Sequence, residues 1–164
     1  MADLPHRSGP PGVRLRAVED DDLDVLFAHQ ADPEAAEMAA FPPRDRARFD
    51  AHWARIRHDD TVILRTIEAD GVVAGNICSW PDGDLRLVGY WIGREHWGRA
   101  VATQALRQFV DEVPLRPLHA HVATRNTGSI RVLEKCGFHR DHAQEARTPA
   151  PADGIEEYIY VLAE

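Results

Sequence analysis

The sequence has fewer basic than acidic residues and no long apolar run, and each shortage excludes a class of protein. Of 19 basic residues in the 164-residue chain only Lys135 is lysine, and 27 acidic residues leave a net charge of −8. An acidic surface repels the phosphate backbone of nucleic acids, so we expect no nucleic-acid partner. No apolar stretch approaches the roughly 20 residues that span a bilayer, and residues 1–13 lack the apolar segment of a secretion signal. We therefore expect no membrane partner and a cytoplasmic location.

Cysteine is also scarce. Cys78 and Cys136 lie far apart, with neither a CxxC pair nor the ligand spacing of a structural zinc site, so we expect two free, buried thiols. One stretch carries four histidines close together: His119, His121, His139 and His142. A zinc site built from these imidazoles is an alternative to a solvated or pocket-lining strand face, but the spacing of known structural sites is absent. We expect no metal.

The remaining composition, 44% hydrophobic and 28% charged, is that of an ordinary globular domain. Residues 1–12, rich in proline and glycine, predict a flexible arm, which leaves residues 13–164 as a single domain. Hydrophobic periodicity predicts strands over residues 13–17, 61–69, 72–80, 85–92, 118–122, from 138 onward and 155–162. It predicts helices over residues 19–31, 33–41, 44–58, 98–112 and 126–136, with Asn126 as a cap. This order indicates an α/β domain: one mixed, mostly antiparallel sheet of about six to seven strands with helices on both faces.

Turn residues predict how these elements connect. Asp70 and Gly71 favour a tight hairpin, and residues 81–83 indicate a second turn. The helix over residues 98–112 crosses over to the next strand, so that strand is expected to lie parallel to its predecessor. The Pro- and Ala-rich segment 142–154 predicts a loop.

The most informative stretch is the strand end at residues 89–92 with the loop that follows. This loop contains Gly93 and Gly98 and leads directly into a helix. Free backbone N–H groups at the positive end of a helix dipole form a site for phosphate or pyrophosphate. The loop lacks the Lys and Ser/Thr that end a Walker A motif, and it is not a GxGxxG opening a βαβ unit.

Two motifs give this anion site a family context. The segment GYWIGREHWGRAVATQAL, residues 89–106, resembles motif A of the GCN5-related N-acetyltransferases (GNAT), and NTGSIRVLEKCGF, residues 126–138, resembles their motif B. The variant that the chain resembles most is the ribosomal-protein N-terminal (alanine or serine) acetyltransferase type. The resemblance runs over residues 13–162, and it implies a GNAT-like single acetyltransferase domain.

The resemblance implies acetyl-CoA as co-substrate, with its pyrophosphate at the start of the helix. Its pantetheine arm would lie along the end of the preceding strand, where that strand parts from the next. Asn126 and Ser129 are the candidate catalytic residues, Asn126 as a ligand of the pantetheine arm and Ser129 beside the thioester sulfur. The implied acetyl-CoA-binding residues are Tyr90, Trp91, Ile92, Arg94, Trp97, Gly98, Arg99, Ala100, Val101, Ala102, Thr103, Asn126, Ser129 and Arg131.

The chain departs from its relatives at two positions. Leu133 stands where many have a tyrosine that protonates the leaving thiolate, and Leu87 where relatives often have a glutamate that acts as base. The implied function is transfer of an acetyl group to a primary amine by direct attack in a ternary complex. The amine belongs to a protein N-terminus or a small molecule, selected by residues 31–58 and 143–154. The alternative is a catalytically inactive acyl-CoA-binding module, and a homodimer is an open expectation.

Overall fold

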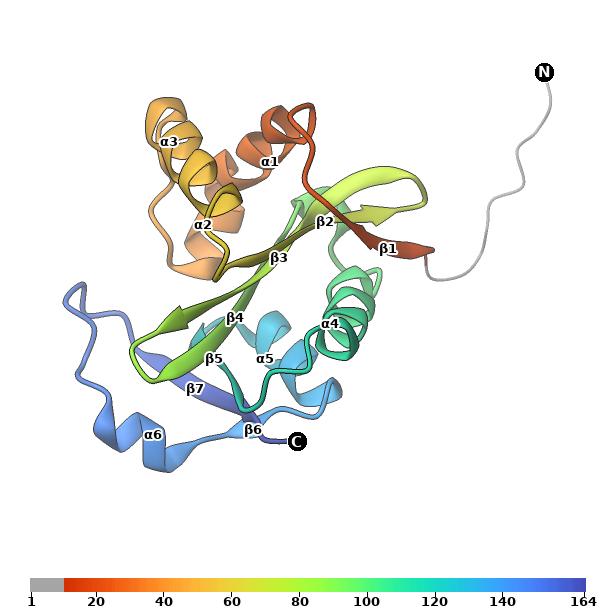
Figure 1. Cartoon of the computed structure of the whole chain (residues 1–164). Coiled ribbons are helices and arrows are strands. Elements are labelled where there is room, and N and C mark those ends of the chain that lie inside the picture. The colour runs from red at the N-terminus through yellow and green to blue at the C-terminus, as the bar shows by residue number, and fades with distance from the viewer. Residues whose placement is uncertain (1–10) are drawn as a thin grey trace, which may run out of the picture.

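The computed structural model describes residues 11–164 and arranges them as one mixed sheet with helices on both faces (Figure 1). The seven strands lie in the order β1-β2-β3-β4-β5-β7-β6, with β4 and β5 parallel and the other neighbours antiparallel. The predicted α/β sheet and its parallel pair are therefore confirmed. The strands are β1 Val13–Arg16, β2 Ile63–Ala69, β3 Val72–Asp82, β4 Leu85–Ile92, β5 Leu118–Ala123, β6 His139–Arg140 and β7 Glu157–Leu162.

The predicted arm falls mostly outside the described residues, which begin at position 11. Gly12 is already tied to the sheet, because it both donates to and accepts from Asp70 at 2.9 Å. Among residues 11–164, no helix has the length and apolar character to cross a membrane. Both cysteines are free and half-buried.

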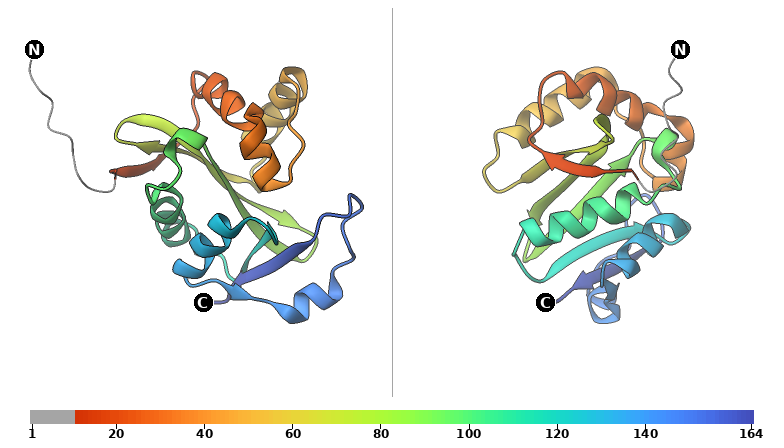
Figure 2. Two further views of the ribbon diagram at one scale, coloured as in Figure 1. Left: turned by 180° about the vertical axis from the view of Figure 1, so that it is seen from behind. Right: turned by 90° about the vertical axis from the view of Figure 1, so that its right-hand side faces the viewer.

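Helices α1, α2 and α3 lie over one face of the sheet, and α4 and α5 lie over the other (Figure 2). Most helices begin at a side chain that accepts a backbone N–H of the first turn, and the predicted Asn126 cap is one of these. The other such caps are Asp32, Asp45 and Asp141. The helices are α1 Asp22–Ala31, α2 Pro33–Ala39, α3 Arg46–Arg57, α4 Val101–Glu112, α5 Thr127–Lys135 and α6 His142–Arg147, and η1 Arg94–His96 is a single 3₁₀ turn.

The predicted Asp70–Gly71 hairpin is confirmed, since both residues have positive φ, 50° and 81°, as a type I′ turn requires. The second turn lies further along the chain than predicted. Pro81 remains in β3 and pairs with Arg86, and the chain reverses at residues 83–84. Gly83, at φ 57°, supplies the left-handed conformation that the turn needs.

The prediction of an unbroken loop over residues 142–154 is wrong in its first half. Residues His142–Arg147 form α6, which Asp141 caps by accepting the Gln144 N–H at 2.9 Å. The run HAQEAR contains good helix formers, whereas the prolines at 149 and 151 confine irregular chain to the residues after the helix.

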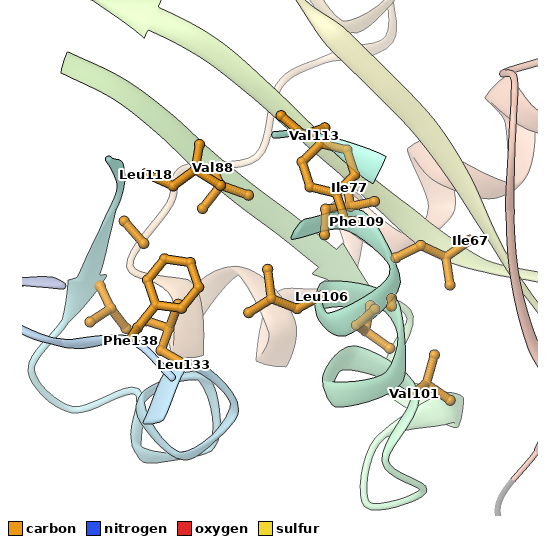
Figure 3. Packing of buried hydrophobic residues seen from close by; sticks show 14 of the residues in the cluster. Ile67, Ile77, Val88, Val101, Leu106, Phe109, Val113, Leu118, Leu133 and Phe138 are labelled. Atoms are coloured by element: carbon orange, nitrogen blue, oxygen red, sulfur yellow. The ribbon is translucent and has the colours of Figure 1, made fainter. Parts of the chain in front are cut away.

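Two hydrophobic clusters hold the helices to the two faces of the sheet. On the α4 side, Leu106 and Phe109 of α4 and Leu133 of α5 point toward Ile77 and Val88 of the strands, as Figure 3 shows. On the other side, α3 buries Phe49 and Trp53 against Leu26 of α1 and Leu64 of β2, with Ile56 packed beside them. Strand β4 lies in the middle of the sheet order and is fixed from both sides.

Candidate active site

A cleft of about 620 Å³ lies beside the end of strand β4, between α2, the start of α4 and α5. Strands β4 and β5 share a single paired position, Leu87 with His119, whereas β4 pairs with β3 along its whole length. This agrees with the parting of the strands that the family resemblance implies. The cleft is lined by Ala35, Met38, Ala39, Tyr90, Trp91, Ile92, His96, Trp97, Gly98, Ala100, Val101, Ala102, Thr103, Asn126, Thr127, Gly128, Ser129, Arg131, Val132 and Lys135.

The loop between β4 and α4 leaves the start of α4 open to the cleft. The helix begins at Val101, three residues later than the predicted start at Gly98, because Gly98 (φ 74°) and Ala100 (φ 61°) are left-handed and therefore cannot be helical. The N-cap residue, Ala100, has no side chain that can accept a hydrogen bond. The first turn of α4 thus offers uncapped backbone N–H groups at the positive end of a helix dipole.

All the residues implied to bind acetyl-CoA line this cleft except Arg94 and Arg99. The Arg94 guanidinium forms ion pairs with Asp32 and Glu34 at the start of α2. Arg99 lies 3.8 Å from Asp70 in the β2–β3 turn. The acetyl-CoA contacts implied for these two arginines remain predictions, and both guanidiniums face carboxylates in the structure.

Backbone groups at the end of β4 were expected to face the pantetheine arm. The carbonyl of Ile92 already accepts the Trp97 indole N–H at 3.0 Å. The indole N–H of Trp91 donates to the carbonyl of His29 in α1 at 3.1 Å. This bond holds the Trp91 side chain on the side of the sheet that carries α1 and α2. Both tryptophans therefore hold the cleft in shape as well as lining it.

Asn126 and Ser129 lie together at the start of α5, on the cleft wall. The Asn126 Oδ1 accepts the backbone N–H of Ser129 at 3.2 Å, and the Ser129 Oγ lies 2.8 Å from the hydroxyl of Tyr90. Burial raises the pKa of the Tyr90 phenol well above its usual value, an effect that the bond to Ser129 partly offsets. Leu133, at the position of the relatives' tyrosine, is 1% exposed and packs in the core.

Several cleft residues were not named individually from the sequence, although those of α2 lie within residues 31–58, which were expected to select the acceptor. Ala35, Met38 and Ala39 of α2 form a wall opposite α5, and the Arg125 guanidinium reaches across to donate to the Glu37 carbonyl at 3.1 Å. Small and apolar residues in a helix carry no signal for a binding site. Lys135 at the end of α5 also lines the cleft, and its place in the sequence gives no sign of this.

The histidines considered for a zinc site take separate partners, since His119 bonds Asp141 at 3.1 Å and His121 bonds Glu157 at 3.2 Å. Within residues 11–164, the group whose ligand atoms converge is instead His29, Glu95 and His96, all within 4.8 Å.

Neither Nδ1 atom of His29 and His96 has a hydrogen-bond partner, although histidines that bind metals almost always donate this second N–H. The Nε2–H tautomer of His29, donating to Glu95 at 3.2 Å, accounts for the pair without a metal. Burial lowers the pKa of His29, and Glu95 opposes that shift.

A family model described as an acetyltransferase (GNAT) domain matches residues 13–139. The chain belongs to the GNAT acetyltransferase family. This GNAT chain is 31% identical to the "Probable N-acetyltransferase YjcK" of Bacillus subtilis over 116 residues. The match covers 68% of this chain and 60% of that relative, so the chain spans less than two thirds of the relative's length.

Solved structures share the GNAT fold at low identity. One is the spermidine N-acetyltransferase of Vibrio cholerae in complex with CoA and spermine, with a TM-score of 0.76, 16% identity and coverage of 92% of this chain and 95% of that one. Another is RimJ of Mycobacterium smegmatis in complex with CoA-disulfide, with a TM-score of 0.69, 21% identity and coverage of 94% and 86%. These likenesses establish the GNAT fold, and the predicted ribosomal-protein subtype remains a prediction.

Proposed function

We propose that the protein is an acetyl-CoA-dependent N-acetyltransferase that acetylates a primary amine by direct attack in a ternary complex. One observation carries this proposal: a single cleft joins an uncapped helix start, a parted pair of strands and the Asn126–Ser129 turn. The uncapped helix start can bind a diphosphate, and the parted strands leave backbone groups for the amides of an extended arm. The Asn126–Ser129 turn supplies polar groups beside a thioester.

In this reading, the pyrophosphate of acetyl-CoA binds the amides of Val101, Ala102 and Thr103. The cationic side chains nearest to it on the cleft wall are Arg131 and Lys135 of α5, both of which line the cleft. We assign the phosphate contacts to these two residues and not to Arg94 and Arg99, since the latter pair with carboxylates. The pantetheine arm then runs along Tyr90–Ile92 toward Ser129.

The chemistry requires a neutral amine, a polarised thioester carbonyl and a stabilised leaving thiolate. An α-amino group with a pKa of about 7.7–8.0 is partly neutral at pH 7, so positioning both substrates supplies much of the rate without a strong base. A backbone N–H near Ile92 serves the carbonyl as charge develops there. The hydroxyl of Ser129 faces the sulfur.

The acceptor reaches the thioester along the wall formed by α2 and Trp91. This wall is apolar at Ala35, Met38 and Ala39, and α2 also carries Glu34 and Glu37. Glu37 and the net charge of −8 favour a cationic acceptor, whereas Glu34 is already paired with Arg94. The protein N-terminus and the small polyamine or aminoglycoside are the acceptor classes we propose.

A second candidate function is an acyl-CoA-binding module without turnover. It is favoured by Leu87 and Leu133, which are 6% and 1% exposed and occupy the positions of the relatives' base and acid with inert side chains.

The two candidates are separated by release of the CoA thiol from acetyl-CoA, followed with a thiol reagent, in the presence of a panel of amines. The panel contains short peptides with free Ala or Ser N-termini, spermidine, an aminoglycoside and free amino acids, and N-acetylated peptides are the matched control. We expect release that depends on the free amine and a product heavier by one acetyl group. Binding of acetyl-CoA without release for any amine supports the inactive module.

A further inference from the structure

Tyr90 and Ser129 form a pair of hydroxyl groups inside the cleft. Tyr90 comes from β4 and Ser129 from the first turn of α5, and their oxygens lie 2.8 Å apart. The Tyr90 hydroxyl also lies 3.3 Å from the carbonyl of Ser129. The pair therefore joins the strand that would carry the pantetheine arm to the helix that would face the sulfur.

The surroundings of the pair fix its geometry on both sides. The Ser129 backbone N–H is held by Asn126 at 3.2 Å, which sets the start of α5. Tyr90 packs against the α4–α5 core, so its ring has little freedom to turn away. Because burial raises the pKa of its phenol, Tyr90 keeps its single proton at physiological pH and can donate it to the Ser129 Oγ or to the Ser129 carbonyl.

We propose that Tyr90 is a positioning residue that acts through Ser129, donating to the Ser129 Oγ so that the serine O–H points at the sulfur of CoA. This inference rests on the proposed function and deepens it. In this proposal, the phenol of Tyr90 on β4, acting through Ser129, takes the place of the tyrosine that the relatives carry on the helix corresponding to α5. Leu133, which stands at that position here, has no hydroxyl group.

The reaction step balances without any further reagent. The amine nitrogen forms a bond to the thioester carbon, the carbon–sulfur bond breaks and its electron pair stays on sulfur. The nitrogen loses its proton to water. The thiolate leaves while it accepts a hydrogen bond from Ser129, whose oxygen becomes a better donor because it accepts one from Tyr90.

A first experiment tests the Tyr90–Ser129 pair without an acceptor amine, by measuring the pKa of the thiol of bound CoA. CoA bound to the protein is titrated with pH at 232 nm, where the thiolate absorbs, and the spectrum with desulfo-CoA is subtracted to remove tyrosine ionisation. If Ser129 and Tyr90 donate toward the sulfur, they favour its charged form and lower the pKa of the bound thiol.

We expect that pKa to be about one unit lower in the wild type than in Ser129→Ala or Tyr90→Phe, which is about a tenfold effect on thiolate stability. Tyr158→Phe is the matched control, since Tyr158 lies on β7 with Arg140 stacked 3.8 Å from its ring. It should titrate like the wild type. A bound thiol with the same pKa in Tyr90→Phe and wild type overturns the inference.

A second experiment uses turnover with an amine found active. We expect kcat to fall about 100-fold in Ser129→Ala and about 10-fold in Tyr90→Phe, with the KM for acetyl-CoA within about twofold. The double variant should be no slower than Ser129→Ala, because Tyr90 acts only through Ser129. Losses that multiply instead, or a change confined to KM, refute the positioning role.

The outcomes separate the inference from the function beneath it. If the pKa of the bound CoA thiol depends on Tyr90 but no amine is acetylated, the proposed function is wrong and the hydrogen bonding of the Tyr90–Ser129 pair to the sulfur stands. Turnover that is unchanged in Tyr90→Phe keeps the function and removes the inference. Failure to bind CoA removes both.

Discussion

Replacing Gly98 by alanine should weaken folding slightly and CoA binding strongly. Gly98 has φ 74°, and a Cβ built on it meets no atom within 4 Å. The whole folding cost is therefore backbone strain, about 1–2 kcal/mol for an L-residue in the left-handed region. For a domain of this size, about 1 kcal/mol lowers the Tm by roughly 2–4 °C.

The same methyl group in Gly98→Ala should change the affinity for CoA more than it changes the stability. Gly98 lines the cleft beside the uncapped turn of α4, so the methyl projects into the space where a phosphate must approach the backbone amides. We expect the Kd for CoA to rise about tenfold or more, which corresponds to about 1.4 kcal/mol of binding free energy. Isothermal titration calorimetry measures the affinity, and urea unfolding measures the stability.

The matched control is Ala100→Gly in the same loop. Ala100 also sits in the left-handed region, at φ 61°, so glycine relieves strain of about 1–2 kcal/mol and loses about 0.5–1 kcal/mol through chain entropy. We expect equal or slightly higher stability and CoA affinity within about twofold of the wild type. If Gly98→Ala binds CoA like the wild type, the phosphates do not lie against this loop and our placement of the cofactor is wrong.

Three further outcomes are expected. Asp22→Ala should lower the free energy of unfolding by about 3 kcal/mol, because the 3%-exposed carboxylate bonds Arg16 at 2.7 and 2.8 Å and also accepts from the buried Thr66 hydroxyl at 2.9 Å and the Glu19 N–H at 2.8 Å. Stability should fall as the pH drops below about 6.5, because unfolded His29 then takes up a proton that the folded state disfavours; His29→Gln should flatten this slope. Arg131→Ala with Lys135→Ala should weaken CoA binding about tenfold and reduce its salt dependence.

Each of these has a control elsewhere on the surface. Asp24→Ala, with an 83%-exposed side chain, should change stability by less than about 0.5 kcal/mol. His142→Gln, 74% exposed at its side chain, should leave the pH slope as it is. Arg147→Ala on α6 should leave CoA affinity unchanged. If a control variant changes the measured stability, pH slope or CoA affinity as much as its test variant does, the physical reason given for that test variant is wrong.

Elements set by neighbouring residues could be predicted from the sequence. The Asp70–Gly71 turn and the Asn126 cap depend on contacts within about three residues, and such contacts leave a local pattern. The same holds for the glycine-bearing loop before α4 and for the order of strands and helices. The predicted start of α4 lies three residues before the observed one, because Ala100 adopts a left-handed conformation that is usually found at glycine.

By itself, then, the sequence determined the element order apart from α6, the glycine-bearing loop before α4 and, through two motifs, the family. Only the tertiary structure decided which side chains face one another. Tyr90 meets Ser129 across 39 positions, and Arg94 meets Glu34 across 60. Such pairings depend on the twist and parting of strands and on the packing of helices, to which many distant residues contribute, so no short pattern encodes them.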